Sequence, residues 1–197
     1  MAIVKHSSSK NARYEDVLEY YTCRHREDSR TGYYAPILDK YGLMQPRSDC
    51  AVLYLTADGT AAAPERWASA CRRTNLCYRK NNKPSDRKSH EYILSHPAAD
   101  RGKLSMDGLV EEGRAFSKAF LQGYDCLIAV HRDTDNDHIH ISINSVRAKA
   151  RAEQAWMMRD SEGNVLLCEI KAGGKHQDSA ELRKAINDWL RDYKSRS

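Results

Sequence analysis

Residues 131–146 constrain the fold and the chemistry of this chain more than any other segment. They place three histidines within ten residues and then alternate polar with apolar side chains. In a β-strand, residues two apart point to the same face. One face of the predicted strand therefore carries His138, His140, Ser142 and Asn144. The opposite face carries Ile139, Ile141, Ile143 and Ser145.

The segment before this strand predicts a hairpin. Residues 126–130 form an apolar run typical of a buried strand, and residues 132–137 are rich in the Asp, Asn and Thr of turns. A hairpin would bring His131 beside His138 and His140, so that three imidazoles converge on one divalent cation. Neutral imidazole suits zinc, manganese, iron or nickel better than magnesium. A polar, solvated sheet face without a metal is the alternative interpretation.

Composition sets broad limits on the class of protein. Hydrophobic residues make up 41% and charged residues 30% of 197 residues, which is ordinary for one globular domain. No apolar run approaches the ~20 residues of a membrane span, and the N-terminus lacks the apolar core of a secretory signal. The six cysteines form no Cys-x-x-Cys pair and are interpreted as reduced core residues of a cytosolic protein. We expect one domain over residues 1–197, as the N-terminal part of a longer protein.

Basic residues are concentrated in one stretch of a chain whose net charge is +5. Between residues 72 and 88 they outnumber a single acid, Asp86. The basic residues are Arg72, Arg73, Arg79, Lys80, Lys83, Arg87 and Lys88. This pattern predicts a strip that binds phosphates, and a solvated basic loop is the alternative.

A helix is predicted from Asn11, as its N-cap, to about Tyr21. Its apolar stripe has helical spacing and consists of Tyr14, Val17, Leu18 and Tyr21. This stripe directs Tyr21 into the core. Tyr20 is turned about 100° away and is free to face a cleft.

The remaining patterns indicate interspersed strands and helices. Strands are predicted at 2–6, 51–56 and 91–95, a further strand pair at 154–160 and 164–171, and helices from 64 to 71 and from 107 to 121. Asp178 and Glu181 form a predicted capping box for a last helix that runs to Tyr193. Because the clearest strand pair is a hairpin, we predict an α+β fold with a central antiparallel sheet and helices packed on it.

Three motifs resemble those of conjugative relaxases of the MobP class, within the HUH endonuclease superfamily. The first is His131-x-Asp133-Thr-Asp-Asn-x-His138-Ile-His140, which continues to Asn144. The second is Val17-Leu-Glu-Tyr20-Tyr-Thr22. The third is Tyr92-Ile-Leu-Ser95-His96, in which a histidine replaces the usual phenylalanine. Together the motifs cover roughly residues 1–146.

The resemblance implies a chemistry for these residues. His131, His138 and His140 would bind a divalent metal, manganese or magnesium in use, with zinc or nickel as alternatives. Tyr20 would attack the scissile phosphate and form a 5′-phosphotyrosine, with Tyr21 as the next candidate. A phenol has a pKa near 10 and needs activation. Asp133 would supply a base, or would instead orient a histidine ligand.

The resemblance also implies the partners. The DNA would be single-stranded and hairpin origin-of-transfer DNA, contacted by the basic strip, by Ser95 and by Asn144; a buried strand serine is the alternative for Ser95. An accessory relaxosome protein, a coupling protein and type IV secretion machinery would act with the domain in the bacterial cytoplasm. Two other functions remain open: a non-catalytic origin-binding module with a structural metal, and a metal hydrolase of small molecules, which would leave the basic strip and the tyrosine unexplained.

Overall fold

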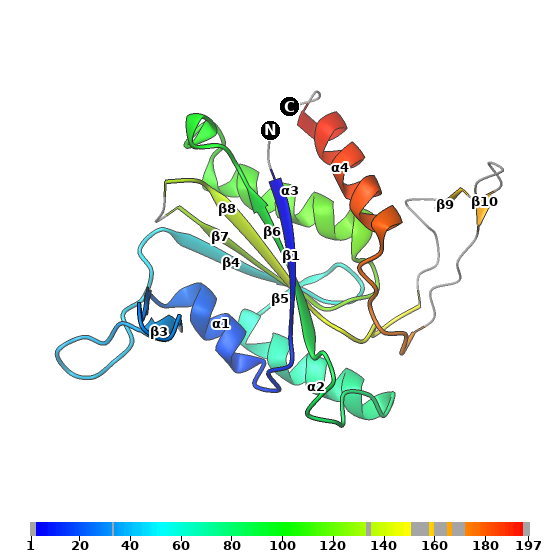
Figure 1. The fold of residues 1–197 in the computed structure, drawn as a ribbon, viewed down its shortest axis with the longest axis horizontal. Helices are drawn as coiled ribbons and strands as arrows, with labels where there is room; N and C mark the ends of the chain where they lie inside the picture. Colours follow the sequence, from blue (N-terminus) through cyan, green and yellow to red (C-terminus); the bar gives the residue numbers. More distant parts are fainter. Residues whose placement is uncertain are drawn as a thin grey trace.

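A six-stranded antiparallel sheet forms the centre of the computed structural model (Figure 1), which describes residues 3–32, 34–132, 135–150, 158–159, 165–166 and 172–194. The spatial order is β1-β6-β8-β7-β4-β5. The strands are β1 (Ile3–Ser9), β4 (Cys50–Leu55), β5 (Ala61–Ala62), β6 (Ser89–Ser95), β7 (Cys126–His131) and β8 (His138–Asn144). Two small antiparallel pairs lie outside it: β2 (His25–Glu27) with β3 (Tyr34–Pro36), and β9 (Met158–Arg159) with β10 (Val165–Leu166).

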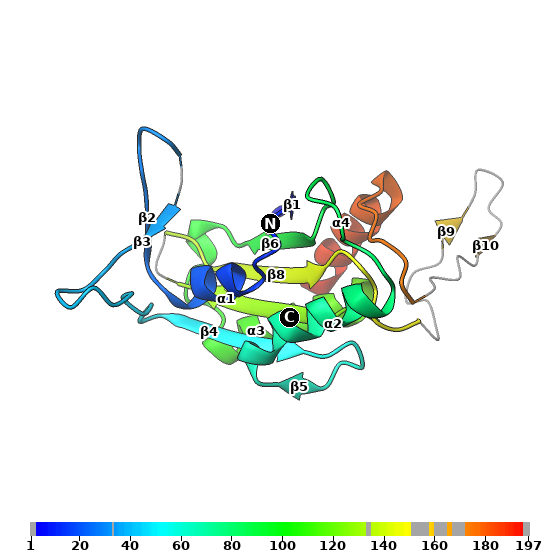
Figure 2. The same ribbon diagram turned by 90° about the horizontal axis from the view of Figure 1, so that it is seen from below.

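The helices cover both faces of this sheet. One face carries α1 (Glu15–Thr22) and α2 (Trp67–Cys77), and the other carries α3 (Met106–Phe120) and α4 (Ala180–Lys194). Figure 2 shows α1 and α2 side by side on the near side of the strands. Two short 3-10 turns, η1 (Pro64–Arg66) and η2 (Ala98–Asp100), complete the described elements. The predicted α+β architecture is confirmed.

The alternation of strand residues produces two hydrophobic cores. Along β7, Ile128 and Val130 pack toward α3 and α4, whereas Leu127 and Ala129 pack toward α1 and α2. Because side chains in a strand alternate between faces, a strand buried on both sides is apolar throughout. All six residues of β7 are buried. Both faces of the sheet are therefore buried, one by α1 and α2 and the other by α3 and α4.

Helix α3 lies very close to the sheet because of one glycine. A Cβ added at Gly113 would lie 2.8 Å from Cγ2 of Ile128 and 3.1 Å from Cγ2 of Ile139. Any larger side chain would push α3 away from β7 and β8, and buried interiors tolerate little overpacking. This close approach fixes the helical layer against the isoleucine face of β8.

Both predicted helix caps are wrong. Helix α1 begins at Glu15 with Tyr14 as its N-cap, and the side chain of Asn11 accepts the backbone N–H of Arg13 at 2.9 Å in the turn before the helix. Helix α4 is capped by Ser179, whose Oγ accepts the N–H of Leu182 at 3.1 Å. A hydroxyl in this position satisfies a helix N–H as well as a carboxylate does.

Other boundaries differ by a few residues. Helix α2 continues into the basic stretch as far as Cys77, and β1 extends to Ser9. The predicted C-terminal strand pair is confirmed where β9 pairs with β10; its other residues lie outside the described part of the chain. Within the described residues, no helix combines the length and apolarity that crossing a bilayer requires.

Candidate active site

The predicted histidine hairpin is present. Strands β7 and β8 pair in a register that sets His131 directly opposite His138. The ring centroids of His131 and His140 are 4.7 Å apart, and those of His138 and His140 are 6.2 Å apart. The three rings lie on one face of the sheet, as the alternation and the hairpin predicted, and α1 covers that face. Asp133 lies outside the described residues, so its role stays a prediction.

Two of these rings are oriented by hydrogen bonds. Nδ1 of His140 lies 3.0 Å from Oε1 of Glu91, and Nε2 of His131 lies 2.9 Å from the backbone carbonyl of Tyr21. Both oxygens only accept, so these nitrogens carry the protons. The lone pairs then sit on Nε2 of His140 and Nδ1 of His131. Metal-binding histidines are held in this way, so His140 and His131 are oriented as ligands of a divalent cation would be.

Glu91 is a site residue that lies near the predicted site in sequence order but to which the sequence assigned no role. Its Oε1 accepts from the hydroxyl of Tyr21 at 2.7 Å as well as from His140. Burial alone would raise the pKa of Glu91, but the bonds from His140 and Tyr21 hold that pKa below its ordinary value. The β6–β8 register sets Glu91 opposite Ser142, and no local spacing revealed that register.

The adjacent tyrosines have different surroundings. Tyr21 is fully buried, and its hydroxyl lies 2.7 Å from Oγ of Ser142. Burial raises the pKa of Tyr21 well above its ordinary value. Tyr20 is half-buried and lines a cavity of about 310 Å³ that also reaches Glu91 and His140. The Tyr20 ring centroid is 6.4 Å from that of His140. The predicted placement, with Tyr21 in the core and Tyr20 at a cavity, is confirmed.

Comparison with protein families now adds to this geometry. The family model "Relaxase: MobA/VirD2-like, nuclease domain" matches residues 51–165, which is more than half of the chain. The chain belongs to the MobA/VirD2-like relaxase nuclease family. Relaxases of this family act on DNA as nucleases and generally use a divalent metal.

A solved structure agrees with the family assignment at the level of the fold. It comes from work on the molecular basis of vancomycin resistance transfer in Staphylococcus aureus. The match has 12% identity and a TM-score of 0.50, and it covers 98% of this relaxase domain and 88% of the other chain. Comparison with curated proteins gave no match.

Two predicted DNA contacts of the relaxase domain lie in its interior instead. Asn144 is fully buried; its Oδ1 accepts from the hydroxyl of Tyr14 at 3.1 Å, and its Nδ2 donates to Oδ1 of Asn75 at 3.1 Å. Lys88 is 4% exposed, and its Nζ donates to the carbonyls of Asn81 and Lys83. These side chains hold the structure together, because their polar atoms are already bonded within the protein.

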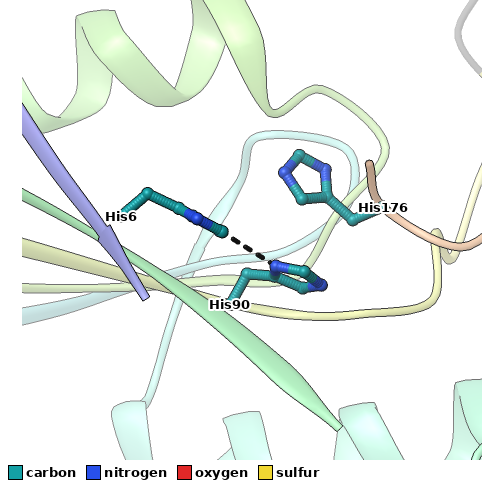
Figure 3. A group of neighbouring side chains, drawn as sticks. All are labelled: His6, His90 and His176. Carbon is teal, nitrogen blue, oxygen red and sulfur yellow. Dashed lines mark hydrogen bonds between the residues drawn. The ribbon is translucent and has the colours of Figure 1, made fainter. Parts of the chain in front are cut away.

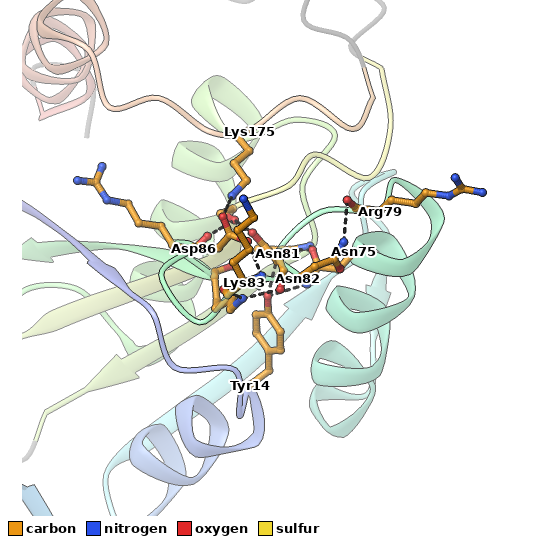
Figure 4. Close-up of polar contacts among 12 residues, drawn as sticks. Tyr14, Asn75, Arg79, Asn81, Asn82, Lys83, Asp86 and Lys175 are labelled. Atoms are coloured by element: carbon orange, nitrogen blue, oxygen red, sulfur yellow. Dashed lines mark hydrogen bonds and ion pairs between the residues drawn. The ribbon is translucent and has the colours of Figure 1, made fainter.

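The same network supports the basic turn (Figure 4), here residues 78–88. Arg79 and Asn81 both adopt positive φ, 52° and 60°. Nδ2 of Asn81 donates to Oδ1 of Asn75 at 3.1 Å and to Oγ of Ser145 at 3.0 Å. In Figure 4 the side chain of Arg79 extends away from this network. The turn is therefore anchored from within, Lys88 included, while Arg79, Lys80, Lys83 and Arg87 are exposed.

The other predicted DNA-binding residues are accessible or near the histidines. The exposed basic residues are Arg72, Arg73, Arg79, Lys80, Lys83 and Arg87. Arg72 already pairs with Glu15, with Nη1 of Arg72 2.9 Å from Oε2 of Glu15. Ser95 is half-buried and pairs across the sheet with His138, so it lies on the strand next to the predicted metal ligands.

Proposed function

We propose that this domain nicks one strand of origin-of-transfer DNA by attack of Tyr20 on a phosphodiester. The bond from Tyr20 Oη to phosphorus forms as the bond from phosphorus to the 3′ oxygen breaks. The phenol loses its proton and the departing 3′ oxygen gains one, so the products are a 5′-phosphotyrosine and a free 3′-hydroxyl. The observation that carries the proposal is the shared cavity of Tyr20 and His140.

The surroundings of the two tyrosines favour Tyr20 as the nucleophile. The hydroxyl of Tyr21 is enclosed and donates to Glu91. A phosphate could reach it only if that bond and the packing around it were broken. Tyr20 opens on the cavity, and the guanidinium carbon of Arg47 lies 5.8 Å from its ring centroid. A cation there would favour the phenolate and the incoming phosphate.

His131, His138 and His140 would hold the divalent metal, for which manganese and magnesium are the first candidates and zinc and nickel the alternatives. When bound, the metal would polarise a non-bridging phosphate oxygen. Glu91 orients His140 through its Nδ1–H. Asp133 stays the proposed base or histidine-orienting group. Ser95, opposite His138 in the sheet, is the proposed hydroxyl contact to the DNA backbone.

The substrate would be single-stranded DNA beside a hairpin. The exposed cations of the basic turn are the proposed backbone contacts. Two tyrosines of residues 34–41, here called the tyrosine arm, are exposed: Tyr34 to 55% and Tyr41 to 75%. The ring of Tyr34 lies 6.0 Å from that of Tyr20. Exposed aromatic rings stack on unpaired bases. We propose that this arm guides the single strand to Tyr20, within a cytoplasmic complex of accessory, coupling and secretion proteins.

The test is a cleavage gel with single-stranded oligonucleotides that tile the DNA beside the gene, with manganese or magnesium. The wild-type protein should form a covalent adduct at one position. Tyr20→Phe should abolish the adduct and keep DNA binding, whereas Tyr21→Phe should keep both. Mass spectrometry of the peptide–DNA adduct identifies the tyrosine. An adduct that persists in Tyr20→Phe would refute the nucleophile. Specific binding without an adduct under any metal would support the non-catalytic origin-binding module.

A further inference from the structure

A second group of three histidines lies on the opposite face of the sheet (Figure 3). His6 belongs to β1, His90 to β6, and His176 to the segment that leads into α4. Their ligand nitrogens all lie within 4.8 Å of one another. The ring centroids of His90 and His176 are 4.8 Å apart, and those of His6 and His90 are 5.2 Å apart.

The register separates this group from the active-site histidines. His6 pairs across the sheet with Tyr92, which belongs to the core under α3 and α4. His90 lies two residues from Tyr92 and therefore points to the same face. Glu91, between them, points to the other face and bonds His140. The sheet itself stands between the two groups.

We propose that His6, His90 and His176 bind a divalent transition metal that ties the lead-in of α4 to the sheet. A tetrahedral zinc with Zn–N bonds of about 2.0–2.1 Å sets its nitrogen ligands about 3.3 Å apart. Nε2 of His6 already lies 3.0 Å from Nδ1 of His90. No two ligand nitrogens are more than 4.8 Å apart. Side-chain movements of about 1.5 Å or less would therefore bring them to the spacing of a tetrahedral site.

The partners of the rings favour a metal site. Nδ1 of His6 lies 3.0 Å from Oδ2 of Asp178, which fixes the proton there and leaves the lone pair on Nε2. A carboxylate behind a histidine ligand is the usual orienting arrangement. His176 lies between two hydroxyls, with Nε2 2.6 Å from Tyr92 and Nδ1 3.3 Å from Tyr124. One ring nitrogen can keep a tyrosine as its partner while the other binds the metal.

The local electrostatics select the kind of metal. The three ligands are imidazole nitrogens, and no carboxylate is among them. The nearby cations, Arg87, Arg147, Lys175 and Arg183, face one carboxylate, Asp178. Neutral nitrogen ligands in basic surroundings bind magnesium weakly. They suit zinc, nickel or cobalt(II), which form strong bonds to imidazole.

Such a metal would act as a cross-link. The three ligands come from the two ends and the middle of the chain, so the ion would close two long loops. A ligand that binds only the folded state raises stability by mass action. The expected role is to hold α4 on the sheet, and it is independent of cleavage on the other face.

The test starts from the variant with His131, His138 and His140 all changed to Ala, which lacks the active-site ligands. We expect it to bind about one equivalent of zinc or cobalt(II) by calorimetry, with a rise in Tm and a visible cobalt absorption typical of nitrogen ligands. Loss of a residue that only orients a ligand weakens metal binding by about 10- to 100-fold. Adding His176→Gln removes a ligand itself, so it should weaken binding by more than that. Adding His25→Gln, outside both groups, should change nothing.

Two results would overturn the proposal: a triple variant that folds by circular dichroism yet binds neither metal, or binding unchanged by His176→Gln. His6→Gln in the wild-type background gives a second check, because it should lower the zinc stoichiometry by one and leave cleavage intact. If the wild-type protein forms no adduct, only the proposed nicking function is contradicted. Metal binding by His6, His90 and His176 is measured without DNA and is judged separately.

Discussion

The two faces of the sheet each carry three histidines, but their surroundings differ. The face under α1 places one of its histidines, His140, beside a cavity that the half-buried phenol of Tyr20 also lines. The face under α4 encloses its histidines among the hydroxyls of Tyr92 and Tyr124 and the carboxylate of Asp178. We therefore propose that the first group serves the reaction and that the second serves cohesion, because the second links β1 and β6 to the segment before α4. Substitutions on the first face should alter cleavage, and those on the second should alter stability.

The largest expected difference in cleavage rate is between the variants His138→Ala and His6→Gln. His138 is half-buried, so its loss should cost little stability, yet cleavage should fall by more than about 100-fold because a metal ligand is lost. His6→Gln should leave the cleavage rate within about twofold. Single-turnover cleavage at saturating metal, with Tm measured for each variant, compares the two. Equal losses of cleavage would erase the distinction between the faces.

Glu91→Gln should have the next largest effect. A glutamine keeps the size of the side chain but loses the charged acceptor that holds His140 and Tyr21. Losing such an orienting partner costs about 10- to 100-fold in metal affinity or activity. The signature is a cleavage defect that excess metal partly rescues. Ser7→Ala is the matched control, because Ser7 reaches only the other oxygen of Glu91, at 3.4 Å.

The opposite outcome, a loss of stability without a loss of cleavage, is expected for Glu112→Ala in α3. Oε2 of Glu112 lies 3.1 Å from Nε2 of His96, and both side chains are buried. The substitution leaves the buried imidazole of His96 without its partner, and an unsatisfied buried polar group costs about 1–3 kcal/mol. Urea unfolding should show this loss with cleavage unchanged below the transition. Glu111→Ala, next in sequence but exposed, should stay within about 0.5 kcal/mol.

The sequence predicted what depends on local periodicity. Alternation along residues 138–144 gave the correct faces, and the turn at 132–137 gave the correct pairing of His131 with His138. Helical spacing correctly separated Tyr20 from Tyr21. Each of these depends on residues that lie close in the chain, where backbone geometry alone decides the outcome.

The relations that failed depend on register between distant strands. Nothing near Glu91 in the sequence indicates that β6 lies beside β8, so its bond to His140 was missed. The same holds for His6, His90 and His176, which meet only when both ends of the chain join the sheet. Lys88 and Asn144 were assigned to DNA from charge and motif, but burial decides whether a polar side chain is accessible.

The smallest expected effect concerns the basic turn, which belongs to neither histidine group. Changing Arg79, Lys80 and Lys83 to Ala should weaken binding to single-stranded DNA and lower its salt dependence by about 0.7 per lost phosphate contact, or about 2 in all. Changing Lys118, Lys184 and Arg191 on the α3 and α4 side removes the same charge and should leave the slope unchanged. Fluorescence anisotropy across a salt series measures both slopes. Equal slopes in the two triple variants would mean that the overall charge of the protein, rather than the basic turn, attracts the DNA. The contacts to the DNA phosphates would then have to be sought nearer to Arg47 and the tyrosine arm.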